Sequence, residues 1–364
     1  MYLQKISLAN FKNYEHLDIE LCPEINCLLG ENGSGKTNLL DAIHYLSMSK
    51  SAFNSIDSQN ILHQENYFTI QGSFEKEQPY LVFCGVQKGQ KKILRLDKQP
   101  YDRISEHIGR FPVVLIAPHD HNLINDGSET RRKHFDSIFS QISPDYLKDL
   151  LAYHYYLKQR NSLLKDFQEK NYLDRDLLLS YDQQLLPLNQ KLYGQRQAFI
   201  QEYLPILVQN YEELSRKKEA VSIRLDSQVG EKNFALHYQK SLDRDIRSTR
   251  THFGAHRDNY LFEINAFPLK KFGSQGQQKT FILALKLAQF AFIKKYTSIK
   301  PLLLLDDIFD KLDDLRIESL MRMIARREFG QIFITDARPE RSKQFLGKIP
   351  ADRKIFLVQK GMIQ

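Results

Sequence analysis

A glycine-rich run near the N-terminus has the residue types and spacing of a phosphate-binding loop, GxxxxGK[ST]. It lies between a predicted strand at residues 25–29 and a predicted helix that begins at Lys36, which is the context this motif requires. Glycines let backbone N–H groups surround phosphate oxygens, and the helix N-terminus adds positive potential. We expect Lys36 to reach the β- and γ-phosphates of ATP and Thr37 to bind Mg²⁺. The predicted loop consists of Gly30, Glu31, Asn32, Gly33, Ser34, Gly35, Lys36 and Thr37.

An apolar stretch that ends in two carboxylates supplies the second part of an ATPase site. Residues 301–305 are predicted to form a buried strand, and Asp306 and Asp307 follow it directly. We expect Asp306 to be the carboxylate of the Mg²⁺ site, directly or through water, and Asp307 to orient or deprotonate the attacking water. An acidic pair that only caps a buried strand is the alternative. Because Lys36 and Asp306 must meet although they lie roughly 270 residues apart, an insertion is expected to interrupt the ATPase.

A third candidate is the loop Ser274, Gln275 and Gly276, which precedes a predicted helix about 30 residues before Asp306. A loop, a helix N-terminus and then an acidic strand is the layout of the signature element of ATP-binding-cassette (ABC) ATPases. In that layout Ser274 and nearby N–H groups would bind the γ-phosphate held by the phosphate loop of a second subunit. The protein would then hydrolyse ATP only as a head-to-tail pair. Ser-Gln-Gly before a helix is also an ordinary N-cap, and this alternative stays open.

Hydrophobic periodicity predicts the elements that must position these residues. Strands are predicted over residues 17–21, 25–29, 68–74, 80–86, 92–96, 221–225, 260–264, 301–305 and 331–335. Helices are predicted from Lys36 onward, in two long stretches between residues 131 and 220, and over residues 281–296 and 318–326. Pro187, Gly194 and Pro205 are expected to kink or divide the second long stretch.

The predicted fold class is α/β: an ABC-type P-loop ATPase head with a mixed sheet, interrupted by a helical arm domain. We assign residues 1–130 to the N-terminal part of the head, residues 131–245 to the arm, and residues 246–364 to the C-terminal part of the head. The third segment carries the signature loop and the acidic strand, whereas the first carries the phosphate loop.

Composition limits the class of protein. The 364 residues are 42% hydrophobic and 26% charged, as in a globular chain of about two domains, and this excludes a fibrous or disordered one. The 52 Lys and Arg exceed the 44 Asp and Glu, and the net charge of +8 weakly favours polyanionic partners. Three cysteines without a CxxC spacing argue against a disulfide framework or a cysteine-based zinc site. With no signal-peptide pattern and no stretch long enough for a membrane span, we expect a cytoplasmic location and no membrane partner.

An ordered series of motifs resembles the RecF family of bacterial DNA replication and repair proteins, relatives of the SMC-type ATPases. The similarity extends over nearly the whole chain, and Ala255 replaces a proline of one family motif. The matching segments are residues 8–14, 30–43, 117–120, 131–136, 254–258, 274–279 and 305–307. The phosphate loop alone would be generic, but this ordered set is specific.

The resemblance implies an ATP-dependent homodimer that binds DNA, with a preference for junctions of single and double strands at gaps. It also implies cooperation with RecO and RecR in loading RecA, and so a link to the SOS response.

The same resemblance places Lys12 and Asn13 near the nucleotide, with an ordinary surface position as the alternative. His256 and Arg257 are candidates for a coupling role or for DNA contact. The alternative is that they form a structural ion pair. Residues 309–313 match the subunit-crossing loop, and Thr335 stands where many relatives carry a γ-phosphate-sensing histidine, so a sensing role for Thr335 or Asp336 stays open.

Three basic clusters are candidates for contact with the DNA backbone, against the alternative of solvated charge. They are Lys88, Lys91, Lys92 and Arg95; Arg131, Arg132 and Lys133; and Arg244, Arg247 and Arg250.

Asp307 is one methylene shorter than the glutamate usual in fast ABC ATPases, so we expect weak, DNA-stimulated hydrolysis that serves as a switch. An ABC-type ATPase subunit of another DNA or transport machine, and a clamp that uses ATP without hydrolysing it, are the alternatives.

Overall fold

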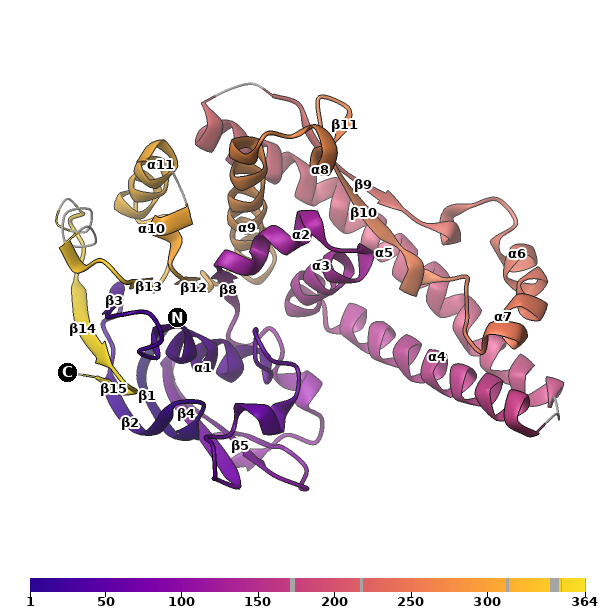
Figure 1. Ribbon diagram of the computed structural model, residues 1–364, viewed down its shortest axis with the longest axis horizontal. Helices are drawn as coiled ribbons and strands as arrows, with labels where there is room; N and C mark the ends of the chain where they lie inside the picture. The colour runs from indigo at the N-terminus through magenta and orange to yellow at the C-terminus, as the bar shows by residue number, and fades with distance from the viewer. Residues whose placement is uncertain (171–173, 217–218, 312–313, 341–346, 348, 364) are drawn as a thin grey trace. The chain divides into compact units, whose positions relative to one another are not determined.

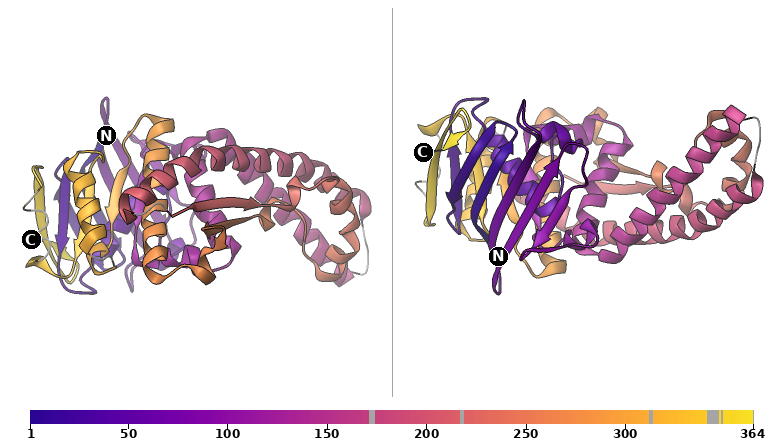
Figure 2. Two further views of the ribbon diagram at one scale, coloured as in Figure 1. Left: turned by 90° about the horizontal axis from the view of Figure 1, so that it is seen from above. Right: turned by 90° about the horizontal axis from the view of Figure 1, so that it is seen from below.

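The computed structural model describes residues 1–170, 174–216, 219–311, 314–340, 347 and 349–363. The chain forms two compact units, whose elements are labelled in Figure 1 and shown from two further sides in Figure 2. Unit 1 comprises Met1–His121, Asn210–Lys217 and Lys279–Gln364, and unit 2 comprises Asn122–Gln209 and Lys218–Gln278. Across the described ranges, every helix is too short or too polar to span a membrane.

An antiparallel sheet with strand order β2-β1-β4-β5-β6-β7 forms one part of unit 1. Its strands are β1 (Tyr2–Phe11), β2 (Tyr14–Glu20), β4 (Tyr67–Glu75), β5 (Pro79–Gln87), β6 (Ile93–Leu96) and β7 (Gln99–Pro100). Burial alternates along β4, as expected where one face of a sheet covers a core. β1 is an addition to the predicted strands. A register shift between Leu3 and Lys5 interrupts its alternation, which explains why periodicity did not reveal it.

A mixed sheet with strand order β15-β14-β3-β13-β12-β8 forms the other part of unit 1. Its strands are β3 (Ile25–Leu29), β8 (Val113–Ile116), β12 (Leu302–Leu305), β13 (Ile332–Asp336), β14 (Arg353–Gln359) and β15 (Met362–Ile363). All pairs are parallel except β14 with β15. β3, β8, β12 and β13 are buried at every residue, so they appear in the sequence as continuous apolar runs.

Helix α1 (Lys36–Met48) contacts strands of both sheets, including β4 and β13, and its apolar residues join the core cluster that both sheets share. This packing places the first turn of α1, and the loop before it, at the carboxyl ends of the parallel strands. The other helices of this part of the chain are α9 (Gln275–Thr297), α10 (Ile308–Lys311) and α11 (Asp314–Ala325). Short 3₁₀ turns occur at η1 (Asp57–Asn60), η2 (Ile104–His107), η3 (Pro118–His121), η4 (Gln228–Gly230) and η5 (Ala255–Arg257).

Unit 2 consists of helices and a small antiparallel sheet of order β11-β10-β9. The helices are α2 (Asn122–Asn125), α3 (Ser128–Ile142), α4 (Pro144–Lys170), α5 (Arg175–Ser215), α6 (Phe234–Lys240), α7 (Leu242–Ser248) and α8 (Leu269–Phe272). The last residues of α5, from Asn210 onward, belong to unit 1. The strands are β9 (Val221–Asp226), β10 (Asn259–Ile264) and β11 (Phe267–Pro268). Because β10 packs on α3, this sheet belongs to unit 2, which therefore extends beyond the arm predicted at residues 131–245. The ATPase roles assigned to the flanking segments stay predictions.

Helix α5 is continuous over 41 residues and contains two prolines. Of the predicted kink or division at Pro187, Gly194 and Pro205, the division is therefore wrong. Each proline removes one backbone hydrogen bond, but buried side chains such as Leu192 and Leu207 hold one face of the helix on both sides of Pro205. Tertiary packing thus outweighs the local preference.

A buried ion-pair network around Arg196 of α5 joins three segments of unit 2. Nη1 of Arg196 donates to Oδ2 of Asp258 at 2.7 Å and to the carbonyl of Ala255 at 2.8 Å. Nη2 donates to Oδ1 of Asp136 on α3 at 2.9 Å, and Nε donates to the hydroxyl of Tyr146 at 3.0 Å. The side chain of Arg196 is 2% exposed and that of Asp258 is fully buried. Removing one partner would leave buried charge without compensation.

We expect Arg196→Met to lower the free energy of unfolding by about 3 to 5 kcal/mol, because the fully buried carboxylate of Asp258 and the partly buried one of Asp136 lose their partner. Urea denaturation followed by circular dichroism measures this loss. The control is Lys133→Met, which removes an exposed ion pair with Glu129 and should change stability by less than about 1 kcal/mol. Equal effects of the two substitutions would show that the Arg196 network does not stabilise unit 2.

Candidate nucleotide-binding site

The predicted phosphate loop connects β3 to α1 and carries two glycines in the left-handed region. The φ angle is 80° at Gly33 and 120° at Gly35, values that residues with side chains rarely adopt. A Cβ atom on Gly35 would also lie 2.6 Å from Nδ2 of Asn13. Helix α1 has neither a side-chain N-cap nor an acidic residue in its first turn. Its N-terminal potential is therefore not offset by a carboxylate of its own first turn.

Lys36 and Ser34 present polar groups that suit an anionic ligand. Lys36 is 4% exposed, and its Nζ donates to the carbonyls of Gly30 at 2.8 Å and Glu31 at 2.9 Å. Both acceptors are neutral, so the ammonium charge is not cancelled by them. Oγ of Ser34 is buried and has no hydrogen-bond partner in the described part of the chain, a costly state unless a ligand supplies one. These features fit the phosphates of a nucleotide.

Thr37, Asp306 and Thr335 meet although they lie far apart in the sequence. Oγ1 of Thr37 donates to Oδ1 of Asp306 at 2.8 Å, and Oγ1 of Thr335 donates to the same oxygen at 2.8 Å. The strands β8, β12 and β13 are parallel and in register, so their carboxyl ends form one edge. The structure thus brings the predicted acidic strand to the predicted phosphate loop.

The donor set at this edge fits Mg²⁺ in chemical type. A hydroxyl from Thr37 and a carboxylate from Asp306 are hard oxygen ligands, which Mg²⁺ prefers over nitrogen or sulfur. Within the described ranges, no group of three or more His, Cys, Asp or Glu side chains could hold a metal ion. An ion at this site would therefore need oxygens from a bound nucleotide as well.

The residues after β12 and β13 are also fixed in place. Asp307 has a φ of 44°, and its backbone N–H donates to Oγ1 of Thr335 at 2.9 Å. Asp336 is buried and accepts from the backbone N–H of Arg338 at 3.0 Å. The hydroxyl of Thr335 thus bridges Asp306 and Asp307, a role that sequence analysis did not find because threonine on a buried strand is common. Leu312, in the segment predicted to be a subunit-crossing loop, lies outside the described residues, as does the residue after it.

The turn after β1 supports the phosphate loop through hydrogen bonds to its backbone. Nδ2 of Asn13 donates to the carbonyl of Ser34 at 3.2 Å, and the hydroxyl of Tyr14 donates to the carbonyl of Gly35 at 3.0 Å. Asn13 therefore contacts the loop that is predicted to hold the nucleotide. Lys12 instead forms an ion pair with Asp41 of α1 at 2.6 Å. Sequence analysis missed Tyr14, although it directly follows Asn13 in the N-terminal motif.

Ser274 begins helix α9 with a reciprocal capping box. Its Oγ accepts from the backbone N–H of Gln277 at 3.2 Å, and its own N–H donates to Oε1 of Gln277 at 2.7 Å. The N-cap alternative is therefore present in the structure. Ser274 and Gln275 are exposed, and the first turn of α9 contains no acidic residue, so the N-terminus also retains its positive potential. This loop lies in unit 2, whereas the phosphate loop lies in unit 1.

The motif at residues 254–258 is part of the packing of unit 2. The hydroxyl of Tyr153 donates to Nδ1 of His256 at 2.7 Å, and Nε2 of His256 donates to the carbonyl of Thr251 at 3.0 Å. Burial lowers the pKa of His256 to about 4, so its ring is neutral at pH 7. These contacts favour a structural role for His256 over a role in coupling or DNA contact. The side chain of Arg257, in contrast, is exposed.

Several cations in the first two predicted DNA-contact clusters are engaged by other groups. Nε of Arg131 donates to Oδ1 of Asn259 at 3.0 Å, and Arg132 donates to the carbonyl of Asp258 at 2.6 Å. Lys92 pairs with the carboxylate of Asp57 at 2.8 Å. Such contacts argue against DNA binding by these three side chains.

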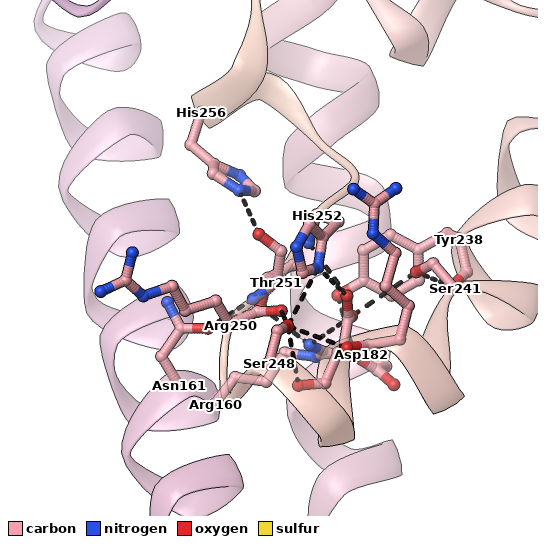
Figure 3. Close-up of polar contacts among 12 residues, drawn as sticks. Arg160, Asn161, Asp182, Tyr238, Ser241, Ser248, Arg250, Thr251, His252 and His256 are labelled. Carbon is pink, nitrogen blue, oxygen red and sulfur yellow. Dashed lines mark hydrogen bonds and ion pairs between the residues drawn. The ribbon is translucent and has the colours of Figure 1, made fainter.

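The third cluster is arranged differently. Arg244, Arg247 and Arg250 are exposed on and just after α7. The inner face of α7 carries Asp245, whose fully buried carboxylate pairs with Nη1 of Arg160 at 2.9 Å. Figure 3 shows the polar contacts around Arg160. The ion pair between Asp245 and Arg160 anchors α7 to α4. The backbone that carries the three exposed arginines is therefore held in place.

Comparisons with known protein sequences point to one family. The sequence profile of the RecF/RecN/SMC N-terminal domain family matches residues 2–363. The DNA replication and repair protein RecF of Flavobacterium johnsoniae is 42% identical over 357 residues, covering 98% of this chain and 99% of the relative. The protein of the same name from Cytophaga hutchinsonii is 43% identical over 364 residues, covering 100% and 97%.

Comparisons with solved structures point to the same family and fold. The recombination mediator protein RecF of the RecFOR pathway, solved with ATP, superposes with a TM-score of 0.88 at 29% identity, covering 100% of this chain and 98% of that one. The Smc head domain of Pyrococcus furiosus matches with a TM-score of 0.56 at 17% identity, covering 100% and 95%, which shows the fold alone. The predicted ABC-type ATPase head with a mixed sheet is thereby confirmed. The chain belongs to the RecF family of DNA replication and repair proteins.

Proposed function

We propose that this protein is an ATP-dependent DNA-binding protein of replication and recombinational repair, in which two copies close on bound ATP. The observation that carries the proposal is the hydrogen bond between Thr37 and Asp306. It joins the phosphate loop to the acidic strand, which a nucleotide switch of this class requires. The relatives with the same family name act in DNA replication and repair, and one has been solved with ATP.

ATP would be held by the residues 30–37. The left-handed glycines expose backbone N–H groups, and Lys36 supplies a positive charge that can leave its two loop carbonyls for the phosphates. Thr37 and Asp306 would hold Mg²⁺, which neutralises phosphate charge when bound. Oγ of Ser34 would gain the partner that it lacks in the described residues.

Asp307 is the group that would orient or deprotonate the attacking water. Its backbone is fixed through Thr335, so its carboxylate is held at the same strand edge as Asp306. Because the side chain is one methylene shorter than glutamate, we infer slow turnover, as suits a switch. Ser274, Gln275 and Gly276 of a second copy would complete the site around the γ-phosphate.

DNA would be bound mainly through its backbone, with Arg244, Arg247 and Arg250 as the contact surface that the structure favours. They are exposed and rigidly supported, unlike Arg131, Arg132 and Lys92. Gapped DNA with a junction of single and double strands is the expected ligand. RecO and RecR are the expected partners in RecA loading, in keeping with the RecFOR pathway of the solved relative.

Sedimentation with and without ATP, in parallel with and without gapped duplex, tests the proposal. The protein should be a monomer without nucleotide and a dimer with ATP, and the dimer should retain gapped duplex more tightly. A monomer under all four conditions would overturn the proposal. Co-purification with a membrane permease would instead support a transport ATPase.

Lys36→Arg should retain measurable ATP binding but lose ATP hydrolysis by about a hundredfold or more. The larger guanidinium keeps the charge but cannot occupy the position between the carbonyls of Gly30 and Glu31. Fluorescent-nucleotide titration and phosphate release measure the two properties. The exposed Lys91→Arg is the matched control and should behave as the wild type. Normal turnover in Lys36→Arg would exclude this role for Lys36.

Asp307→Asn should bind ATP and accumulate as a dimer, because the nucleotide that holds the two copies together is no longer hydrolysed. Analytical ultracentrifugation after incubation with ATP measures the dimer fraction. Asp352→Asn, which changes an exposed carboxyl just before β14, is the control. An Asp307→Asn protein that stays monomeric with ATP would count against the composite site.

Replacing Arg244, Arg247 and Arg250 together by Gln should weaken binding to gapped duplex. The slope of log affinity against log salt should also fall by about 0.9 for each DNA phosphate that is no longer neutralised by an arginine. Fluorescence anisotropy at several salt concentrations measures both changes. The control replaces Lys88, Lys91 and Arg95 by Gln and removes the same charge. If the control weakens binding as strongly, the α7 surface is not the specific DNA-binding surface.

A further inference from the structure

The side-chain amide of Gln277 connects two segments of unit 2. Its Oε1 accepts from the backbone N–H of Ser274 at 2.7 Å, while its Nε2 donates to Oε1 of Glu219 at 3.0 Å. Glutamate can serve as well as glutamine at this position of a capping box. Only glutamine, however, can accept from Ser274 and also donate to a carboxylate.

Glu219 is itself attached to a rigid frame. The next residue, Ala220, exchanges two hydrogen bonds with Asn265: its N–H donates to Oδ1 of Asn265 at 3.1 Å, and its carbonyl accepts from the N–H of Asn265 at 2.6 Å. From there β9 and β10 pair without interruption from Val221 with Ile264 to Asp226 with Asn259. Glu219 therefore extends from one end of the ribbon that β9 and β10 form within the small antiparallel sheet.

The other end of this ribbon is held by the arm helices. Asp258 directly precedes β10, and its buried carboxylate pairs with Arg196 of α5 at 2.7 Å. Its carbonyl accepts from Arg132 of α3 at 2.6 Å. A continuous series of buried or paired contacts thus runs from α5 through β10 and Glu219 to the loop before α9. This also gives the motif at residues 254–258 a physical role, namely as the attachment of the ribbon to the arm.

We infer that Gln277 is a positioning residue that couples the arm to the Ser274 loop. A movement of α5 on DNA would displace Asp258 and the β9–β10 ribbon, and Gln277 would transmit the displacement to the N-terminus of α9. The inference rests on the proposed function, in which this loop binds the γ-phosphate of a second copy. A contiguous set of contacts is a necessary condition for such coupling, and mutational coupling is its test.

A donor–acceptor exchange tests the inference. Gln277→Glu retains the capping acceptor for Ser274 but brings a second carboxylate to Glu219. Glu219→Gln alone preserves a hydrogen bond, because an amide oxygen can still accept from Gln277. In the double variant the amide at position 219 donates to the carboxylate at position 277, which restores both hydrogen bonds and the original net charge.

The stimulation of ATP hydrolysis by gapped duplex should fall about tenfold in Gln277→Glu. It should stay within about twofold of the wild type in Glu219→Gln and recover to the same range in the double variant. ATP binding to the phosphate loop and the unfolding midpoint should be unchanged in all three proteins. The ATP-induced dimer fraction from sedimentation is the second readout and should follow the same pattern.

The outcomes separate this inference from the proposed function. Normal stimulation in Gln277→Glu, or no recovery in the double variant, overturns the inference while the proposed function stands. A lowered unfolding midpoint that parallels the loss would reduce Gln277 to a structural residue and also overturns it. If the wild type neither dimerises with ATP nor responds to DNA, the proposed function fails, and the coupling fails with it.

Discussion

The structure of the site depends on one buried carboxylate. Oδ1 of Asp306 accepts two hydroxyl hydrogen bonds, from Thr37 at the start of α1 and from Thr335 at the end of β13. A buried carboxylate is costly unless such donors compensate it. The two donors can reach it only if β12 and β13 end at the same level, beside the helix that begins at Lys36. The parallel register of the mixed sheet is therefore the condition for the site, and the long helical segment between its halves is tolerated because it leaves that register intact.

In unit 2, buried ion pairs join the helices to one another and to neighbouring segments. Its long helices enclose two arginines with almost no exposed surface, Arg160 and Arg196, each satisfied by carboxylates from other segments. Such pairs add less net stability than apolar contacts would, but each guanidinium accepts only partners in a definite geometry. In the coupling proposed above, the arm carries positional information, and the definite geometry of these pairs would keep its helices from sliding along an apolar interface. The network at Asp258 and the capping box at Gln277 lie at the two ends of the same ribbon.

The strands and the helix around the candidate site were easier to predict from the sequence than the outer parts of the fold, for a physical reason. The phosphate loop, the acidic strand and most buried strands have local signals: glycine spacing, continuous apolar runs and flanking turns. β1 contains a register shift, and β14 is exposed at most positions, so neither gives a clean period. The continuity of α5 through two prolines comes from packing that no local pattern reports. Likewise the threonine that bridges Asp306 and Asp307 becomes visible only when β13 lies beside β12.

The two interpretations of Ser274, a helix cap and an anion site, are compatible in physical terms. The capping box stabilises the first turn of α9 and fixes the direction of its axis, but it introduces no negative charge. The first turn of this 23-residue helix therefore contributes positive potential at an exposed N-terminus, and the nearest carboxylate described there is that of Glu219, which accepts from Gln277. Preorganised dipoles bind an anion without reorganisation at the moment of binding, so a loop already locked by its cap is a better anion site than a flexible one. The cap would then be a precondition for the proposed anion site, and Gln277, which forms it, is the residue through which we propose that the loop is moved.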